Sequence, residues 1–212
     1  MIWNNSNYLM HYGVPRRSGR YPYGSGKNPR ASRRFSNSKS QTVFVSGSSK
    51  TQNPDSVYFR KNLPKQVTDQ LDEHMSNKKR IVVGDAPGID RQVQNYLKSK
   101  NYNNVELYGP GQQIRYAANK NWKQNLIDAP EYEPGSKEWL AKKDIAMTNA
   151  ATEGLAIVLK DGANATRRNV SRLMSQNKKV KVYELNDQGE TMDRFMSDRE
   201  VRRIMKMKIN KI

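Results

Sequence analysis

The sequence predicts an α/β fold built on a doubly wound, mostly parallel sheet. The first observation behind this prediction is that five short β-rich runs alternate with stretches of helical apolar spacing between residues 41 and 190. The second is that three of these runs end in loops of small residues that lead toward a predicted helix. Strands that alternate with helices in this way form βαβ units around a parallel sheet.

The five predicted strands are TVFVSGSS from residue 42, RIVVG from 80, NVELYG from 104, GLAIVLKDG from 154 and KVKVYEL from 179. The predicted helices between them cover residues 54–76, 89–100, 136–151 and 166–177. Pro64 lies inside the first of these helices, where proline must kink or restart the helix. Residues 110–135 are less regular than the stretches on either side of them.

The two ends of the chain differ from this region in composition. Residues 1–40 hold eight Lys and Arg and no Asp or Glu, within a net charge of +18 for the whole chain. They are rich in Gly, Pro and Ser and have no periodicity, so we expect an extended basic arm that orders only against a partner. Residues 191–212 predict a basic amphipathic helix capped by Ser197, with its apolar stripe at Val201, Ile204, Met205 and Ile212. We therefore divide the chain into an arm (1–40), an α/β domain (41–190) and a C-terminal helix (191–212).

Composition excludes several kinds of site. The chain has no cysteine, which excludes disulfides and cysteine-ligated metals. Its two histidines, His11 and His74, argue against a metal site or a catalytic triad built on histidine, and we predict no metal. There is no run of 18 apolar residues and no signal-like N-terminus, so we expect neither a membrane span nor secretion.

Three small-residue loops follow predicted strands and point to a ligand site. In an open parallel sheet, ligands bind outside the carboxyl ends of the strands, where loops lead into helices. Glycine lets a ligand approach the backbone, and the free amides and dipole of a helix start favour an anion. The three loops are Ser46–Ser49, Gly84–Gly88 and Asp161–Thr166.

The side chains of these loops suit a nucleotide. Serine and threonine hydroxyls could donate to a phosphate, and aspartate carboxylates could accept from ribose hydroxyls or a base. One such loop alone is often only a structural turn, but three at one sheet edge favour a nucleotide-type ligand. The candidate binding residues are Gly47, Ser48, Ser49, Gly84, Asp85, Ala86, Gly88, Asp90, Asp161, Gly162, Asn164 and Thr166.

The same stretches resemble the Rossmann-like SLOG superfamily, which includes the DNA-processing protein of natural transformation and the cytokinin-activating phosphoribohydrolases. The resemblance rests on VFVSGSS, VVGDAPGIDRQVQNYL and KKDIAMTNAATEGLAIVLKDGANATRRNV followed by KVKVYEL, and it covers about residues 41–186. It is closest to the small stand-alone nucleotide-binding members, which carry a comparable strand–GxAxGxD–helix element. IRYAANKNW, with Arg115, also looks like the basic stretch that these proteins place after the third strand. The resemblance implies a nucleotide or ADP-ribose-like ligand in the crevice between the loops.

One departure from the superfamily bears on catalysis. The hydrolase branch has a Pro-Gly-Gly-x-Gly-Thr-x-x-Glu element whose glutamate is catalytic, whereas Asn169 stands at the corresponding position here. An amide cannot replace a carboxylate as a general base. The resemblance therefore favours binding of a nucleotide over its hydrolysis.

Three further residues have two readings each. Asp144 matches a position near the ligand in the superfamily, but it could equally be a helix-surface acid that balances Lys142 and Lys143. Trp122 and Trp139 are expected to be packing residues rather than platforms on which a base stacks.

The arm has a resemblance of its own. LMHYGVPRRSGRYPYGSG looks like a short element near the start of tailed-bacteriophage structural and virion-associated proteins. Arginines interleaved with tyrosines provide charge and stacking surface for DNA, RNA or an acidic protein groove, and the alternative is an unbound tail. The candidate contact residues are Arg16, Arg17, Arg20, Tyr21, Tyr23, Arg33 and Arg34.

These observations lead to three functional hypotheses. The first is a phage-encoded protein that senses, sequesters or processes a nucleotide-derived ligand and attaches to virions or nucleic acid through its arm. The second is a nucleic-acid-binding module that uses the basic ends, and the third is a structural virion protein with an α/β scaffold. We expect the protein in the host cytoplasm or on the virion, with a homo-oligomer among the assemblies that the sequence allows.

Overall fold

The computed structural model describes residues 41–47, 63–159, 164–185 and 194–209. The whole predicted arm, Ser48, Ser49, Asp161 and Gly162 therefore lie outside the described residues. The elements are β1 (Thr42–Gly47), α2 (Lys65–Ser76), β2 (Arg80–Gly84), α3 (Ile89–Ser99), β3 (Val105–Pro110), β4 (Lys123–Ile127), α4 (Lys137–Ala150), β5 (Glu153–Leu159), α5 (Asn164–Ser175), β6 (Lys179–Leu185), β7 (Arg194–Phe195) and α6 (Asp198–Ile209).

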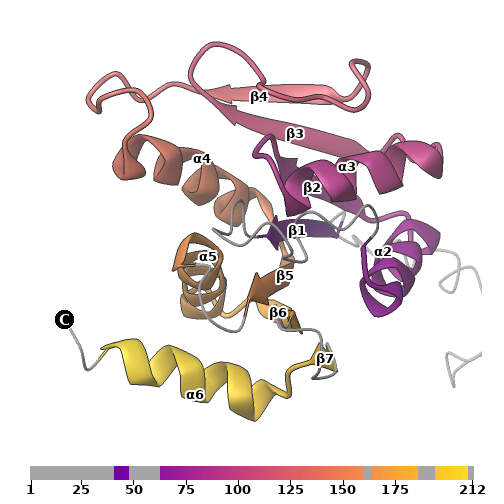
Figure 1. The fold of residues 1–212 in the computed structure, drawn as a ribbon, viewed down its shortest axis with the longest axis vertical. Helices are drawn as coiled ribbons and strands as arrows, with labels where there is room; N and C mark the ends of the chain where they lie inside the picture. The colour runs from indigo at the N-terminus through magenta and orange to yellow at the C-terminus, as the bar shows by residue number, and fades with distance from the viewer. Residues whose placement is uncertain (1–40, 48–62, 160–163, 186–193, 210–212) are drawn as a thin grey trace, which may run out of the picture. The chain divides into compact units, whose positions relative to one another are not determined.

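The strands form one sheet in the order β4-β3-β2-β1-β5-β6-β7 (Figure 1). All neighbouring strands are parallel except β6 and β7, which are antiparallel. The chain moves outward from β1 to β4, and then returns through α4 to place β5 on the other side of β1. This is the doubly wound, Rossmann-like arrangement that the sequence predicts. Its topological switch point lies between β1 and β5.

Helices cover both faces of the sheet because alternate strand residues point to opposite sides. Val43 and Val45 of β1 belong to a core cluster that includes Val67 of α2 and Val93 of α3. Phe44, between them in sequence, belongs to a second cluster with residues of α4 and α5. The two helix layers are visible on either side of the strands in Figure 1. Strand β1 is thus packed on each of its two faces by a separate hydrophobic cluster.

The C-terminal helix α6 begins directly after Ser197, as predicted. The Ser197 hydroxyl accepts a hydrogen bond from the Glu200 amide at 3.4 Å, and the Glu200 carboxylate accepts from the Ser197 amide at 2.8 Å. This reciprocal pair is a capping box. Val201 is buried with residues of α5, β5 and β6, which docks the first turn of α6 on the sheet.

The five predicted strands are confirmed as β1, β2, β3, β5 and β6. The first predicted helix, residues 54–76, is confirmed from Lys65 onward, with Pro64 at its N-cap; residues 54–62 lie outside the described residues. Residues 110–135, which are less regular in sequence, contain the edge strand β4. In the part of the chain that the structure describes, no helix has the length and apolar character needed to cross a membrane.

Candidate functional site

A pocket of about 420 Å³ opens at the switch point, beyond the carboxyl ends of β1 and β2 and at the start of α5. Its walls come from β1, the β2–α3 loop, α4 and α5, so residues far apart in the sequence meet there. We call it the switch-point pocket. It is lined by Phe44, Ser46, Gly47, Ala86, Pro87, Asp90, Arg115, Leu140, Lys143, Asp144, Met147, Ala165, Thr166 and Asn169.

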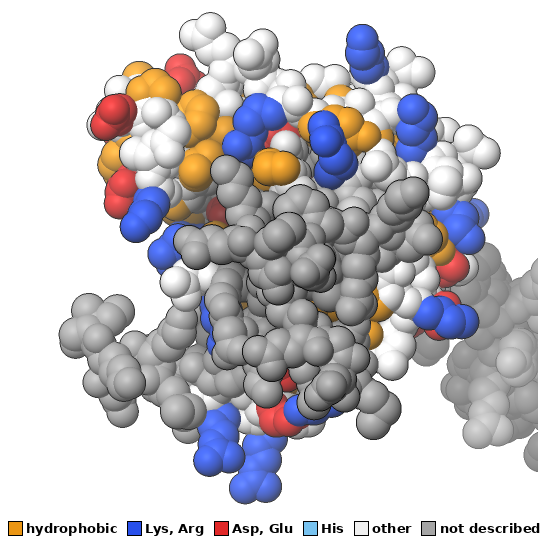
Figure 2. Space-filling model, viewed as in Figure 1, with side chains coloured by type: hydrophobic (Ala, Val, Ile, Leu, Met, Phe, Trp, Pro, Cys, Tyr) orange, Lys and Arg blue, Asp and Glu red, His pale blue; other side chains and the backbone are white. Residues whose placement is uncertain are grey.

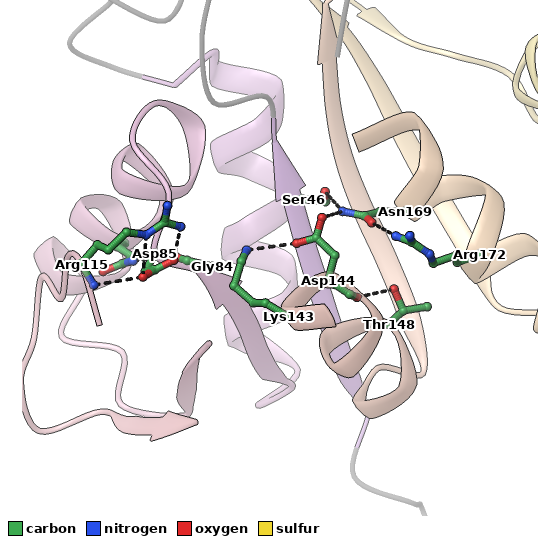
Figure 3. A network of polar contacts seen from close by, with 10 residues as sticks. Ser46, Gly84, Asp85, Arg115, Lys143, Asp144, Thr148, Asn169 and Arg172 are labelled. Atoms are coloured by element: carbon green, nitrogen blue, oxygen red, sulfur yellow. Dashed lines mark hydrogen bonds and ion pairs between the residues drawn. The ribbon is translucent and has the colours of Figure 1, made fainter. Parts of the chain in front are cut away.

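An ion pair between Arg115 and Asp85 forms one side of the site (Figure 3). The Arg115 side chain donates to the two Asp85 carboxylate oxygens at 2.6 and 3.0 Å, and its backbone amide donates at 3.0 Å. These bonds to Asp85 raise the pKa of Arg115 further. The Asp85 side chain has no exposed surface, whereas that of Arg115 is 41% exposed. Asp85 therefore positions Arg115, and Arg115 is the partner that lines the pocket.

A second polar network crosses the pocket from α4 to α5 and β1 (Figure 3). Lys143 donates to one oxygen of Asp144 at 3.0 Å, and the Asn169 amide donates to the other at 3.1 Å. The same Asn169 amide donates to the Ser46 hydroxyl at 3.0 Å, and Arg172 donates to the Asn169 oxygen at 2.7 Å. The Asp144 carboxylate is thus fixed from both sides and faces the pocket.

Asp90, in the first turn of α3, is buried beside the Lys143 ammonium group. Burial raises the pKa of Asp90 to about 7, although Lys143 opposes this rise. Burial alone would lower the pKa of Lys143, but the carboxylates of Asp144 and Asp90 outweigh it and raise that pKa. Lys143 is therefore a cation at neutral pH, and Asp90 changes its charge near neutral pH.

The glycines of the predicted loops make room for the protein's own side chains. A Cβ at Gly84 would collide with the Asp90 carboxylate and would lie 2.8 Å from the Lys143 Nζ, and a Cβ at Gly47 would collide with Ile89. Gly88, at the N-cap of α3, has φ +92° and ψ −129°. Residues with a Cβ rarely adopt this backbone conformation, whereas glycine adopts it readily. The absence of a Cβ at Gly47 and Gly84 therefore leaves room for Ile89 and for the Asp90 and Lys143 side chains, and Gly47 also lines the pocket.

The first turns of α3 and α5 both reach this edge. Thr166 is buried and lines the pocket, while Asn164 is exposed at the start of α5. The start of each helix carries the positive end of the helix dipole, which favours an anion. The pocket therefore combines sites for an anion with carboxylate acceptors.

The structure brings many predicted residues to one place. Those that line the pocket are Gly47, Ala86, Asp90, Arg115, Asp144 and Thr166. Gly84 and Asp85 lie directly behind its wall, and Gly88 and Asn164 begin the two helices. Asp144 lines the pocket and also pairs with Lys143 at 3.0 Å, so its position near a ligand stays a prediction.

Sequence reasoning missed Lys143 and the role of Asn169. The adjacent lysines Lys142 and Lys143 look equivalent in the sequence. However, Lys143 shares one helix face with Leu140 and Met147, and that spacing distinguishes it from Lys142. Asn169 was read only as the loss of an acid. The structure shows that it holds the carboxylate of Asp144 at 3.1 Å, so an acid is present beside it.

Comparisons with protein-family models, with curated proteins and with solved structures give no match. The resemblance to the SLOG superfamily therefore stays a prediction. Among the described residues, no group of three or more His, Cys, Asp or Glu side chains is placed to hold a metal ion.

Proposed function

We propose that the protein binds a nucleotide-derived ligand in the switch-point pocket. The observation that carries this proposal is the position of the pocket, where the strand order reverses and residues from the first turns of α3 and α5 line the same cavity. Ligands of doubly wound sheets bind at this place, and phosphates favour helix starts. The volume of about 420 Å³ is within the range of small-molecule sites.

The lining contains hydrogen-bond donors that suit the phosphate of a nucleotide and carboxylate acceptors that suit its ribose. Thr166, near the start of α5, supplies a hydroxyl donor for a phosphate, and the exposed Arg115 guanidinium lines the same pocket. The positive end of the α5 dipole favours an anion at the same place. Asp144 and Asp90 supply acceptors for ribose hydroxyls. The resemblance of the three loops to nucleotide-binding members of the SLOG superfamily supports the same ligand class.

We favour binding of the nucleotide over its hydrolysis, and the position of Asp144 indicates how to test this. Asn169 replaces the acid of the hydrolase branch, which argues against hydrolysis by that route. However, the carboxylate of Asp144 lies 3.1 Å from the Asn169 amide, inside the same pocket. Any ligand found to bind should therefore be recovered after incubation and analysed for cleavage products.

The test is a thermal-shift panel of AMP, ADP-ribose and cyclic nucleotides, combined with mass spectrometry of small molecules released from the purified protein. A ligand at 100 times its Kd stabilises the fold by about 2.7 kcal/mol, which raises Tm by several degrees. Thr166→Val removes one hydroxyl from the pocket and should reduce the shift. The matched control is Thr68→Val on α2, a helical threonine on an element that does not line the pocket.

Two results would count against this proposal. One is the absence of any shift across the panel together with no released nucleotide. The other is an equal loss of binding in Thr166→Val and Thr68→Val, because that would indicate a general loss of stability rather than a pocket effect.

A second function belongs to the arm. Its eight Lys and Arg without any Asp or Glu favour contact with a polyanion, and its resemblance to virion-associated phage proteins suggests where it attaches. We propose that residues 1–40 tether the nucleotide-binding domain to nucleic acid or to a phage particle.

A further inference from the structure

A second depression lies beside the switch-point pocket on the same sheet edge. It has a volume of about 530 Å³ and is formed by the segment that follows β3 and by the first turn of α4. Arg115 lines both the depression and the switch-point pocket, so one side chain stands between them. We call this depression the Trp139 depression; it is lined by Pro110, Gly111, Gln112, Gln113, Arg115 and Trp139.

Trp139 is held in a fixed place at the wall of this depression. Its amide is capped by the Ser136 hydroxyl at 3.2 Å, which fixes the first turn of α4. Gly111, with φ +75°, lies against the ring, and a Cβ there would come within 2.8 Å of the ring atom Cζ2. The indole is nevertheless only partly buried. Hydrophobic side chains gather at the surface over α4 in Figure 2. A fixed, accessible aromatic ring is suited to stacking.

The polar groups around the ring suit a neutral, flat ligand group. Gln112 and Gln113 are exposed, and each amide can both donate and accept hydrogen bonds, as the edge of a nucleobase requires. The lining contains no carboxylate and no lysine. Its one charged member, Arg115, already pairs with Asp85 at 2.6 Å. The depression therefore offers little net positive charge to a second phosphate. It offers an aromatic ring and two amide side chains to a base.

The two cavities adjoin at Arg115, which lines both of them, so one ligand can extend from one cavity into the other. Arg115 lies at the junction, where the sugar or a phosphate of the ligand would pass.

We infer that the Trp139 depression is the base-binding subsite of the nucleotide ligand, with the base stacked on Trp139 and its edge on Gln112 and Gln113. This inference rests on the proposed function, because it places one half of the ligand whose other half occupies the switch-point pocket. Trp139 is then a stacking platform, contrary to the expectation from sequence that it only packs.

The test compares AMP, ADP-ribose and ribose 5-phosphate, which lacks a base, by isothermal titration calorimetry on the full chain. Stacking contributes about 1–3 kcal/mol per base. Trp139→Ala should therefore weaken the binding of AMP and ADP-ribose by about 5-fold to 150-fold, and leave that of ribose 5-phosphate within about twofold. Leu126→Ala removes another exposed apolar side chain, 46% exposed on β4, and should change none of the three.

Intrinsic fluorescence gives a second readout that does not depend on the alanine variant remaining folded. AMP or ADP-ribose should change the tryptophan emission of the parent chain, and Trp139→Phe should remove that change while retaining an aromatic ring and most of the affinity. Trp3 and Trp122 remain as internal references, and Trp122 is buried.

The outcomes separate the two proposals. If a nucleotide binds but Trp139→Ala retains full affinity and the emission of Trp139 does not respond, the base lies elsewhere and only this inference is overturned. Binding of ribose 5-phosphate as tight as that of AMP would overturn it as well. If no probe binds the parent chain, the proposed function fails and this inference fails with it.

Discussion

At the scale of a single residue, the raised pKa of Asp90 makes the stability of the fold depend on pH. Burial raises its pKa to about 7 from the ordinary value of 3.8, with Lys143 opposing the rise and Asp144 and Asp85 adding to it. The folded chain therefore keeps this proton to a higher pH than the unfolded chain does. The stability that Asp90 contributes is complete below about pH 4, and it is lost as the pH rises to about 7.

Asp90→Asn should remove this dependence while retaining the size of the side chain. Between pH 5 and pH 8 the parent should lose stability relative to the variant, by at most about 1.4 kcal/mol per pH unit up to pH 7. Urea unfolding at several pH values measures the difference. The lowered pKa of His74 acts in the opposite sense, but both chains contain His74 and its effect cancels. Parallel stability curves for the two chains would refute the role given to Asp90.

The residues of the pocket also show which parts of a site a sequence can predict. Asp90, Asp144 and Thr166 line one pocket, and the sequence singles them out because each lies beside a small-residue loop or matches a known pattern. Asp85 was expected to face the ligand, but its carboxylate is used by Arg115, thirty residues away. Such a pairing depends on three-dimensional contacts, which no local pattern contains.

At the scale of elements, the parallel core was predictable and the edges were not. The central strands are buried on both faces and therefore read as apolar runs. The edge strand β4 reads KQNLI with its residues exposed or half-buried, so it lacks both an apolar run and a clear alternation. Its pairing with β3, from Lys123 opposite Glu106 to Ile127 opposite Pro110, is what makes it a strand.

The capping box of α6 gives a prediction at this scale. Ser197→Ala removes the acceptor for the Glu200 amide and should destabilise the start of the helix by about 1 kcal/mol, whereas Ser197→Asp should retain the cap. Hydrogen exchange of α6 amides is the measurement, because a helix at the sheet edge can open without global unfolding. The control is Ser99→Ala, at the last residue of α3. Equal protection of α6 in the parent and Ser197→Ala would show that Val201 packing alone holds it.

At the scale of the whole molecule, the basic charge is unevenly distributed. Residues 1–40 carry eight basic residues and no acid, whereas the domain mixes both signs. Several lysines of the domain form ion pairs, including Lys65 with Asp69 at 2.7 Å and Lys142 with Glu131 at 2.7 Å. Figure 2 shows Lys and Arg side chains at separate places on the described surface of this face. The arm is therefore the stretch expected to dominate contact with a polyanion.

Replacing Arg16, Arg17 and Arg20 together by Gln should weaken binding to nucleic acid and make it less sensitive to salt. Each lost phosphate contact lowers the slope of log K against log salt by about 0.9 for duplex DNA, so the slope should fall by about 2.7 if all three arginines contact phosphates. The matched control replaces the exposed lysines Lys78, Lys98 and Lys120 of the domain by Gln, which removes the same charge. Titrations of labelled DNA and RNA at several salt concentrations give both slopes. An equal fall of the slope in the two triple variants would mean that net charge alone drives binding. An unchanged slope in the arm variant would leave an acidic protein groove as the partner of the arm.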